Sequence, residues 1–135
     1  MIKQLFFSFF ALFLFTGIHA QNITEPDSRL YEVYSEKQVQ DWMQNSPNKI
    51  KLKNAELNYG YKFKTMPEDK IAQFPKLVKI DPQSKTELGT VKTINESDFN
   101  LYLYKYERNY KSDKFYRIGN TQKVLVIISH KELAD

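Results

Sequence analysis

The stretch FNLYLYKYERNYKSDKFYRIGNTQKVLVIIS, residues 99–129, has the clearest pattern in the chain and decides the predicted fold. Read as a strand, its first part places apolar side chains on one face, namely those of Phe99, Leu101 and Leu103. The other face then carries phenol rings, those of Tyr102, Tyr104 and Tyr106. A strand that is apolar or aromatic on both faces is typical of the centre of a sheet.

Two turns and a second buried segment complete this stretch. Residues 111–113 (KSD) form the first predicted turn, and Gly119-Asn120 forms the second, because both residues tolerate the positive φ that hairpin turns often need. Residues 124–128 (VLVII) form a continuous apolar run, as in a strand that is buried on both faces. We expect Leu125 and Ile127 to share one face of that strand, with the other three residues of the run opposite.

Further strand patterns precede this stretch. Residues 57–64 (LNYGYKFK) alternate apolar and polar side chains and predict a half-buried strand, in which Gly60 marks a bulge or a close approach. Residues 76–80 and 86–94 flank the turn sequence DPQS and predict a hairpin. A short strand over residues 30–34 has weaker support, and residues 48–53 fit either a strand or a short helix.

Two capping boxes predict two short helices. Ser35 and Gln38 mark the start of the first, which should end near Ser46, and Trp42 should anchor it on the sheet. Residues 65–68 (TMPE) mark the start of the second. Residues 130–135 predict the start of a final helical turn. The chain as a whole predicts an α+β domain with a mostly antiparallel sheet of about five strands and two short helices packed on it.

The N-terminus has the layout of a secretory signal peptide. A short basic start is followed by an apolar run over residues 5–18, and a small residue, Ala20, stands at the expected cleavage position. An uncleaved membrane anchor is the alternative, although the run is shorter than the roughly twenty apolar residues that span a bilayer. We therefore predict a signal peptide over residues 1–20, a flexible tether over residues 21–29 and a single α+β domain over residues 30–135.

Composition limits the environment and the partners. The 135 residues contain no cysteine and carry a formal net charge of +4, which becomes +3 once Lys3 leaves with the leader. An exported chain without disulfides favours a bacterial envelope protein, periplasmic or secreted, that folds by packing alone. So small a positive charge does not predict a nucleic-acid partner, and no segment after the leader is expected to span a membrane. Another envelope protein is the expected partner.

Few residues could carry catalysis. His130 is the only histidine after the leader, no nucleophile-elbow motif accompanies it, and a single histidine cannot supply a zinc site. We expect no metal and no cofactor. The remaining catalytic candidates are carboxylates, which lie at Glu68, Asp69, Glu96 and Asp98.

The tyrosine row is the candidate binding site. Arg108 and Tyr110 continue the face of Tyr102, Tyr104 and Tyr106. The row could be the second face of the sheet, packed under a helix, or an exposed surface of the kind that tyrosine favours at protein contacts. We expect partial burial and predict a non-catalytic binding module. The alternatives are a carboxylate-dependent hydrolase acting on glycan and a structural subunit of a larger envelope assembly.

Overall fold

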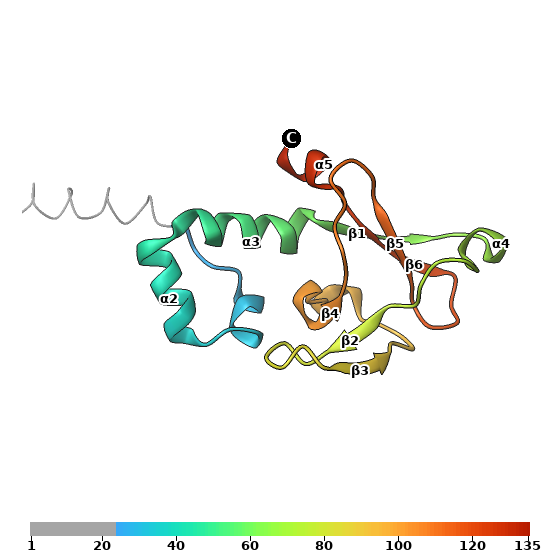
Figure 1. Ribbon diagram of the computed structural model, residues 1–135, viewed down its shortest axis with the longest axis horizontal. Helices are drawn as coiled ribbons and strands as arrows, with labels where there is room; N and C mark the ends of the chain where they lie inside the picture. Colours follow the sequence, from blue (N-terminus) through green and yellow to red (C-terminus); the bar gives the residue numbers. More distant parts are fainter. Residues whose placement is uncertain (1–23) are drawn as a thin grey trace, which may run out of the picture.

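The computed structural model describes residues 24–135, with the longer helices at one end and two antiparallel sheets, accompanied by two short helices, at the other (Figure 1). The predicted leader, residues 1–20, and the first part of the predicted tether, residues 21–23, lie outside the described residues. The predicted α+β class is confirmed, and so is the antiparallel pairing of the strands.

Strand β6 (Lys123–Ile127) lies in the middle of the first sheet, between β1 (Tyr61–Thr65) and β5 (Lys114–Arg117). Both neighbours run antiparallel to it. Because each edge of β6 is paired and each face is covered, a continuous run of branched apolar residues is stable there. The predicted buried strand is confirmed.

The two faces of β6 pack into two hydrophobic clusters. Leu125 and Ile127 belong to the larger cluster, which also contains residues of the helices. The smaller cluster takes the other face, with Val124, Val126 and Ile128. All five side chains are buried, so the predicted division of the run between two faces is confirmed.

The turn between β5 and β6 uses the predicted glycine. Gly119 has φ +57°, and the turn is closed by hydrogen bonds from the Ile118 N–H to the Lys123 carbonyl and from the Thr121 N–H to the Ile118 carbonyl. A Cβ at Gly119 would lie 2.5 Å from the Lys92 carbonyl oxygen. Both the backbone angle and the close approach therefore favour glycine at this position.

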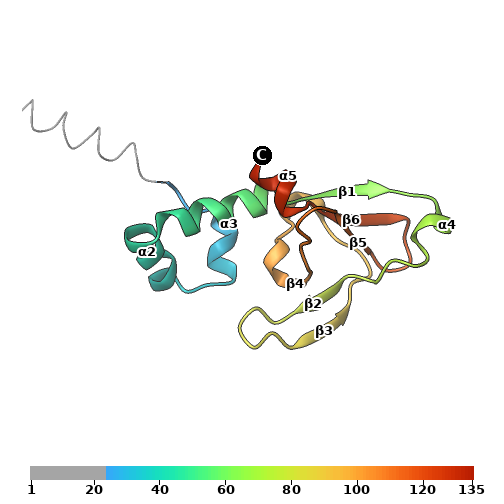
Figure 2. The ribbon, with the colours of Figure 1, turned by 45° about the horizontal axis from the view of Figure 1, so that its top comes forward.

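The second sheet has the order β3-β2-β4, formed by β3 (Glu87–Thr90), β2 (Val78–Ile80) and β4 (Tyr104–Lys105). Strands β2 and β3 form the hairpin predicted around residues 81–84, and Figure 2 shows it extending below the first sheet. The Asp81 carboxylate accepts backbone hydrogen bonds from Gln83 and Ser84 and thereby stabilises the turn.

The sheets meet at a single isolated parallel bridge between Lys76 and Arg117. There the Leu77 N–H donates to the Arg117 carbonyl at 2.8 Å. The prediction of one sheet of about five strands is therefore corrected to two three-stranded sheets. Leu77 separates the bridging residue Lys76 from β2, which pairs only with β3 and β4.

The helical end consists of a 3-10 helix, η1 (Ser28–Glu32), and two α-helices, α2 (Glu36–Asn45) and α3 (Pro47–Tyr59). The Ser35 hydroxyl accepts the Gln38 N–H at 3.1 Å, as the predicted cap requires. Helix α2 ends before Ser46, as predicted. Trp42 is buried, but its ring contacts Tyr34 and the ammonium groups of Lys49 and Lys53 of α3, so the predicted anchoring on the sheet is not confirmed.

One strand prediction at this end is wrong, and another is confirmed only for its second half. Residues 30–34 fall largely within η1, and residues 57–59 belong to α3, so the strand starts only at Tyr61. The alternation of residues 57–64 was misleading because Leu57 is buried equally well from a helix, where it joins the larger cluster. Gly60 does mark a close approach: a Cβ there would lie 2.5 Å from the Glu56 carbonyl oxygen.

Two more short helices bring the α-helices of the described residues to four. Helix α4 (Glu68–Ile71) buries Ile71, but its N-cap is Pro67 and no side chain caps it, so the second capping box does not form. Helix α5 (His130–Ala134) begins after Ser129, whose hydroxyl accepts the Glu132 N–H.

The predicted aromatic strand is mostly not a strand. A 3-10 helix, η3 (Leu101–Leu103), replaces its centre, and only the two residues of β4 pair. The cause is Asn100, whose side-chain oxygen accepts the Tyr102 N–H while its amide donates to the Arg29 carbonyl and to Glu32. A buried asparagine that bonds nearby backbone competes with the sheet ladder.

Truncation of β6 should test the core. We expect Ile127→Ala to lower the free energy of unfolding by about 2–5 kcal/mol, because it removes fully buried methylene and methyl groups and leaves a cavity. Chemical denaturation measures this change. Leu88→Ala is the matched control, because Leu88 lies on β3 with 60% of its surface exposed and should change stability by no more than about 0.5 kcal/mol. Equal effects at the two positions would contradict the assignment of β6 to the core.

Candidate functional site: a tyrosine-lined pocket

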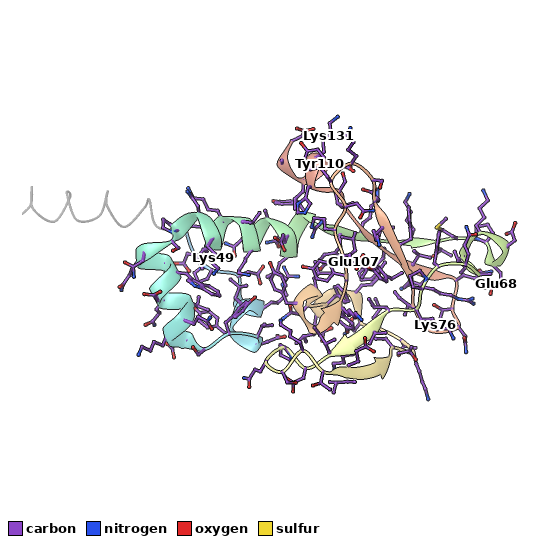
Figure 3. All side chains as sticks on the ribbon, viewed as in Figure 1. Lys49, Glu68, Lys76, Glu107, Tyr110 and Lys131 are labelled. Carbon is purple, nitrogen blue, oxygen red and sulfur yellow. The ribbon has the colours of Figure 1, made fainter. Side chains whose placement is uncertain are left out.

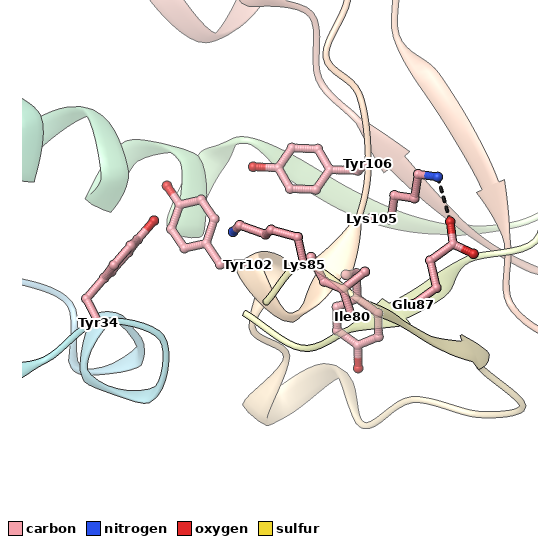
Figure 4. A pocket seen from close by; sticks show the side chains of 8 residues that line it. Tyr34, Ile80, Lys85, Glu87, Tyr102, Lys105 and Tyr106 are labelled. Atoms are coloured by element: carbon pink, nitrogen blue, oxygen red, sulfur yellow. Dashed lines mark hydrogen bonds and ion pairs between the residues drawn. The ribbon is translucent and has the colours of Figure 1, made fainter. Parts of the chain in front are cut away.

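An open pocket of about 410 Å³ lies beside η3 and β4, and we call it the tyrosine pocket (Figure 4). Its aromatic lining consists of Tyr34, Tyr102, Tyr104 and Tyr106. The rest of the lining comes from the second sheet and its hairpin, with Ile80, Lys85, Glu87 and Lys105. The three tyrosines predicted to share a strand face thus surround one pocket, together with a fourth from the segment before α2.

Each tyrosine of the row is half-buried and packs against the larger hydrophobic cluster. Tyr104 stacks on buried Phe99, with ring centroids 4.8 Å apart and an interplanar angle of 16°. Tyr102 meets Tyr34 edge to face at 6.3 Å. The row therefore packs on the core with part of its surface and lines the open pocket with the rest.

Glu56 of α3 holds two of these phenols. Its Oε2 accepts hydrogen bonds from the Tyr102 hydroxyl at 3.0 Å and from the Tyr106 hydroxyl at 3.4 Å. Burial raises the pKa of Tyr102 and of Tyr106 well above the usual range, and the nearby Glu56 carboxylate raises both further. Both side chains therefore remain neutral hydrogen-bond donors throughout the physiological pH range.

Lys53, one turn before Glu56, holds the fourth ring. Its ammonium donates to the Tyr34 hydroxyl at 3.1 Å and lies 4.8 Å from the centroid of that ring. The same ammonium is 4.9 Å from the Tyr102 centroid and 5.4 Å from that of Trp42. Cation–π attraction to three rings favours one arrangement of these side chains. The hydroxyl ends of Tyr34, Tyr102 and Tyr106 are thus fixed to α3, and the rings are pre-positioned.

Charged side chains form the rim of the pocket. Lys105 and Glu87 are paired across the second sheet, with 2.6 Å between ammonium and carboxylate. The ammonium of Lys85 makes no hydrogen bond or ion pair with any residue in the range 24–135, and in Figure 4 its side chain extends toward Tyr102. The local charge of the lining is therefore positive.

Arg108 and Tyr110, the other residues of the predicted site, do not line this pocket. Arg108 donates from Nη1 to the Gly60 and Ile128 carbonyl oxygens and so connects the end of α3 to the end of β6. Its Nη2 is buried without a hydrogen-bond partner among the described residues. Tyr110 is 67% exposed and lies beside α5, near Lys131 (Figure 3).

The four carboxylates considered for catalysis lie in two different places, outside the tyrosine pocket. Glu68 forms an ion pair with Arg117 at 2.7 Å, far along the first sheet from the pocket, and Asp69 follows it in α4 (Figure 3). Glu96 and Asp98 do line a second open hollow, of about 570 Å³, next to the ion pair of Asp27 with Arg29.

Two of the four carboxylates that line this hollow, Glu96 and Asp27, are held in ion pairs. Lys123 pairs with Glu96 at 2.8 Å. Hydrogen bonds from Arg29 lower the pKa of Asp27, the opposite of the shift that a general acid needs. Asp27 and Arg29, from the described end of the predicted tether, also contact Asn58 of α3. His130 occupies the first turn of α5, where its backbone N–H donates to the Asn109 carbonyl.

Within residues 24–135, no three His, Cys, Asp or Glu side chains are grouped so that they could hold a metal ion. None of the helices in this range has the length and apolarity needed to cross a membrane. Comparison with protein-family models, with curated proteins and with solved structures finds no match to this chain. Any functional conclusion therefore rests on the site itself.

Sequence reasoning missed Tyr34 and Lys85, which line the pocket, and also Lys53 and Glu56 of α3, which hold its rings from the inner side. Lys53 and Glu56 are three residues apart and share a face only if the segment is helical. Because residues 48–53 fitted either a strand or a helix, that face could not be assigned. Tyr34 and Lys85 reach the pocket from distant segments through tertiary packing, which leaves no local signal.

The two raised pKa values predict a loss of stability at alkaline pH. The folded state favours the neutral phenols, whereas an unfolded tyrosine loses its proton near pH 10, so stability should be complete below about pH 10 and fall as pH rises above it. Tyr102→Phe removes one of these phenols and should make the fall shallower in denaturant titrations across this range.

Tyr59→Phe is the matched control for this experiment, because Tyr59 is 75% exposed and lies outside the pocket. It should keep the wild-type dependence of stability on pH. Parallel stability curves for wild type and Tyr102→Phe above about pH 10 would show that Tyr102 is not held in its neutral form by the fold.

Proposed function

We propose that this protein is an exported, non-catalytic binding module of the cell envelope that recognises a partner protein through the tyrosine pocket. The observation that carries the proposal is the arrangement of Tyr34, Tyr102, Tyr104 and Tyr106 around an open hollow. Aromatic rings with one apolar face and fixed rotamers supply contact area at little further cost in conformational entropy.

The anchoring of the rings supports a binding role. If the tyrosines served the core alone, nothing would require an open face, yet all four line a hollow of about 410 Å³. That volume lies in the range of ligand sites, roughly 300–1,000 Å³. Glu56 and Lys53 fix three hydroxyl groups on the inner side, so the ring surfaces remain available to a partner.

Export is supported by the sequence of residues 1–20, and the absence of cysteine from an exported chain favours a bacterial envelope protein. N-terminal sequencing of the exported protein should begin at Gln21. The hydrolase alternative has less support, because Glu96 and Asp27 are held in ion pairs and the pKa of Asp27 is lowered.

The proposal is tested by recovering partners from the native envelope. Full-length protein with a C-terminal tag is exported, purified under mild conditions and analysed by mass spectrometry. We expect Tyr104→Leu to reduce recovery of the bound protein by about tenfold or more, because a few aromatic anchors tend to carry most of the affinity of an interface. Leucine keeps apolar contact with Phe99, so the fold should survive.

Tyr34→Leu provides a second variant, at the pocket residue that comes from the segment before α2. Tyr59→Leu is the matched control and should leave recovery unchanged. Each variant is first checked for cooperative unfolding. Full recovery of the partner with both folded pocket variants would reject the pocket as the binding site.

A further inference from the structure

We propose that the tyrosine pocket takes an acidic segment of the partner protein, in which an apolar side chain enters the pocket and a neighbouring carboxylate pairs with Lys85. This inference rests on the proposed function and specifies the chemistry of its partner. It follows from three features of the pocket: its charge, the backbone at Lys85 and the polar groups that remain free.

The first feature is charge. Three charged side chains line the pocket, and two of them, Lys105 and Glu87, neutralise each other at 2.6 Å. Lys85 is left with no partner among residues 24–135, so the pocket presents one uncompensated positive charge beside its rings. Charge complementarity then selects a negatively charged group, because a cationic segment would be repelled at short range.

The second feature is the conformation of Lys85. Its φ is +63°, in the left-handed region where glycine or asparagine is the usual residue. The turn itself is held by backbone bonds, from the Lys85 N–H to the Asp81 carbonyl at 2.8 Å and from the Asp81 N–H to the Thr86 carbonyl. The turn therefore does not need a lysine side chain, and unfavourable backbone angles of this kind tend to persist where the side chain has a role.

The third feature is the shortage of free polar groups. The hydroxyls of Tyr34, Tyr102 and Tyr106 already bond Lys53 or Glu56 on the inner side. Within residues 24–135 the pocket therefore offers ring surface, the Lys85 ammonium and the Tyr104 hydroxyl, which are few groups to match the dense hydroxyls of a neutral sugar. An apolar side chain matches the ring surface, and a carboxylate beside it matches the Lys85 ammonium. The pocket volume of about 410 Å³ suits one or two side chains.

Two peptide mixtures test this inference. Both are random hexapeptides with blocked ends and flanking Leu or Phe, and they differ only in a fixed central residue, which is Glu in one mixture and Gln in the other. Binding to 15N-labelled protein is followed through the amide signals of Ile80, Lys85, Glu87 and Lys105. We expect the Glu mixture to shift these signals at lower concentration than the Gln mixture, and added salt to remove the difference.

Three variants assign the effect to Lys85. Lys85→Asn suits the left-handed backbone and should weaken binding of the Glu mixture about two- to fivefold, the effect of losing an exposed ion pair. Lys85→Arg keeps the charge and should retain wild-type binding. Lys111→Asn, at an exposed position outside the pocket, removes the same net charge and should also bind as wild type.

The outcomes separate this inference from the proposed function. If the mixtures bind equally, if neither binds, or if Lys85→Asn matches wild type, the acidic segment is rejected. The pocket would still be the partner site if Tyr104→Leu and Tyr34→Leu lose the envelope protein. If a neutral oligosaccharide such as maltotriose shifts the pocket signals and the Glu mixture does not, the ligand is a glycan and the inference is overturned.

Discussion

Burial of β6 on both faces is the constraint on which the rest of the structure depends. One face packs with the helices in the larger cluster, and the other packs under α4 and α5 in the smaller one. A strand that must be covered twice requires elements on both sides of the first sheet, and the chain has no disulfide to hold them there. Tyr61 and Phe63 of β1 extend the larger cluster toward Phe99, so the core reaches the base of the tyrosine pocket.

A small set of polar contacts then places the pocket on that core. Asn100, buried among apolar residues, turns the chain into η3 and directs Tyr102 toward α3. Glu56 and Lys53, one turn apart on α3, receive the hydroxyl ends of the rings. Because these contacts lie within the protein itself and fix the rings, the pocket should need little rearrangement to bind, which is the condition for affinity from a small contact area.

The sequence predicted the local structure correctly where only one structure fits the pattern of residues. Four features were predicted and observed, because each depends on residues that are close in the chain. They are the buried run at 124–128, the Ser35 cap, the hairpin around Asp81 and the turn at Gly119. Asn100 shows the opposite case. Its effect on the aromatic segment depends on Arg29 and Glu32, about seventy residues away, and alternation alone could not reveal it.

The candidate site, like the fold, could be predicted only in part from the sequence. The row of Tyr102, Tyr104 and Tyr106 could be selected from composition and spacing, although the sequence placed it on a continuous strand. The residues that shape the pocket around it come from three other segments and could not be selected. Arg108, chosen because it continued the row, instead bonds the carbonyl groups of Gly60 and Ile128.

The central claim is that Glu56 pre-positions the tyrosines, and a double-mutant cycle between Glu56 and Tyr102 tests it most directly. The free energy of unfolding is measured for Glu56→Met, which removes the acceptor oxygens, for Tyr102→Phe and for the double variant by chemical denaturation. Residues that share a hydrogen bond should show a coupling of about 0.5–3 kcal/mol, so the double variant should be more stable than the sum of the single changes implies. Additive effects, with no coupling beyond experimental error, would contradict the account.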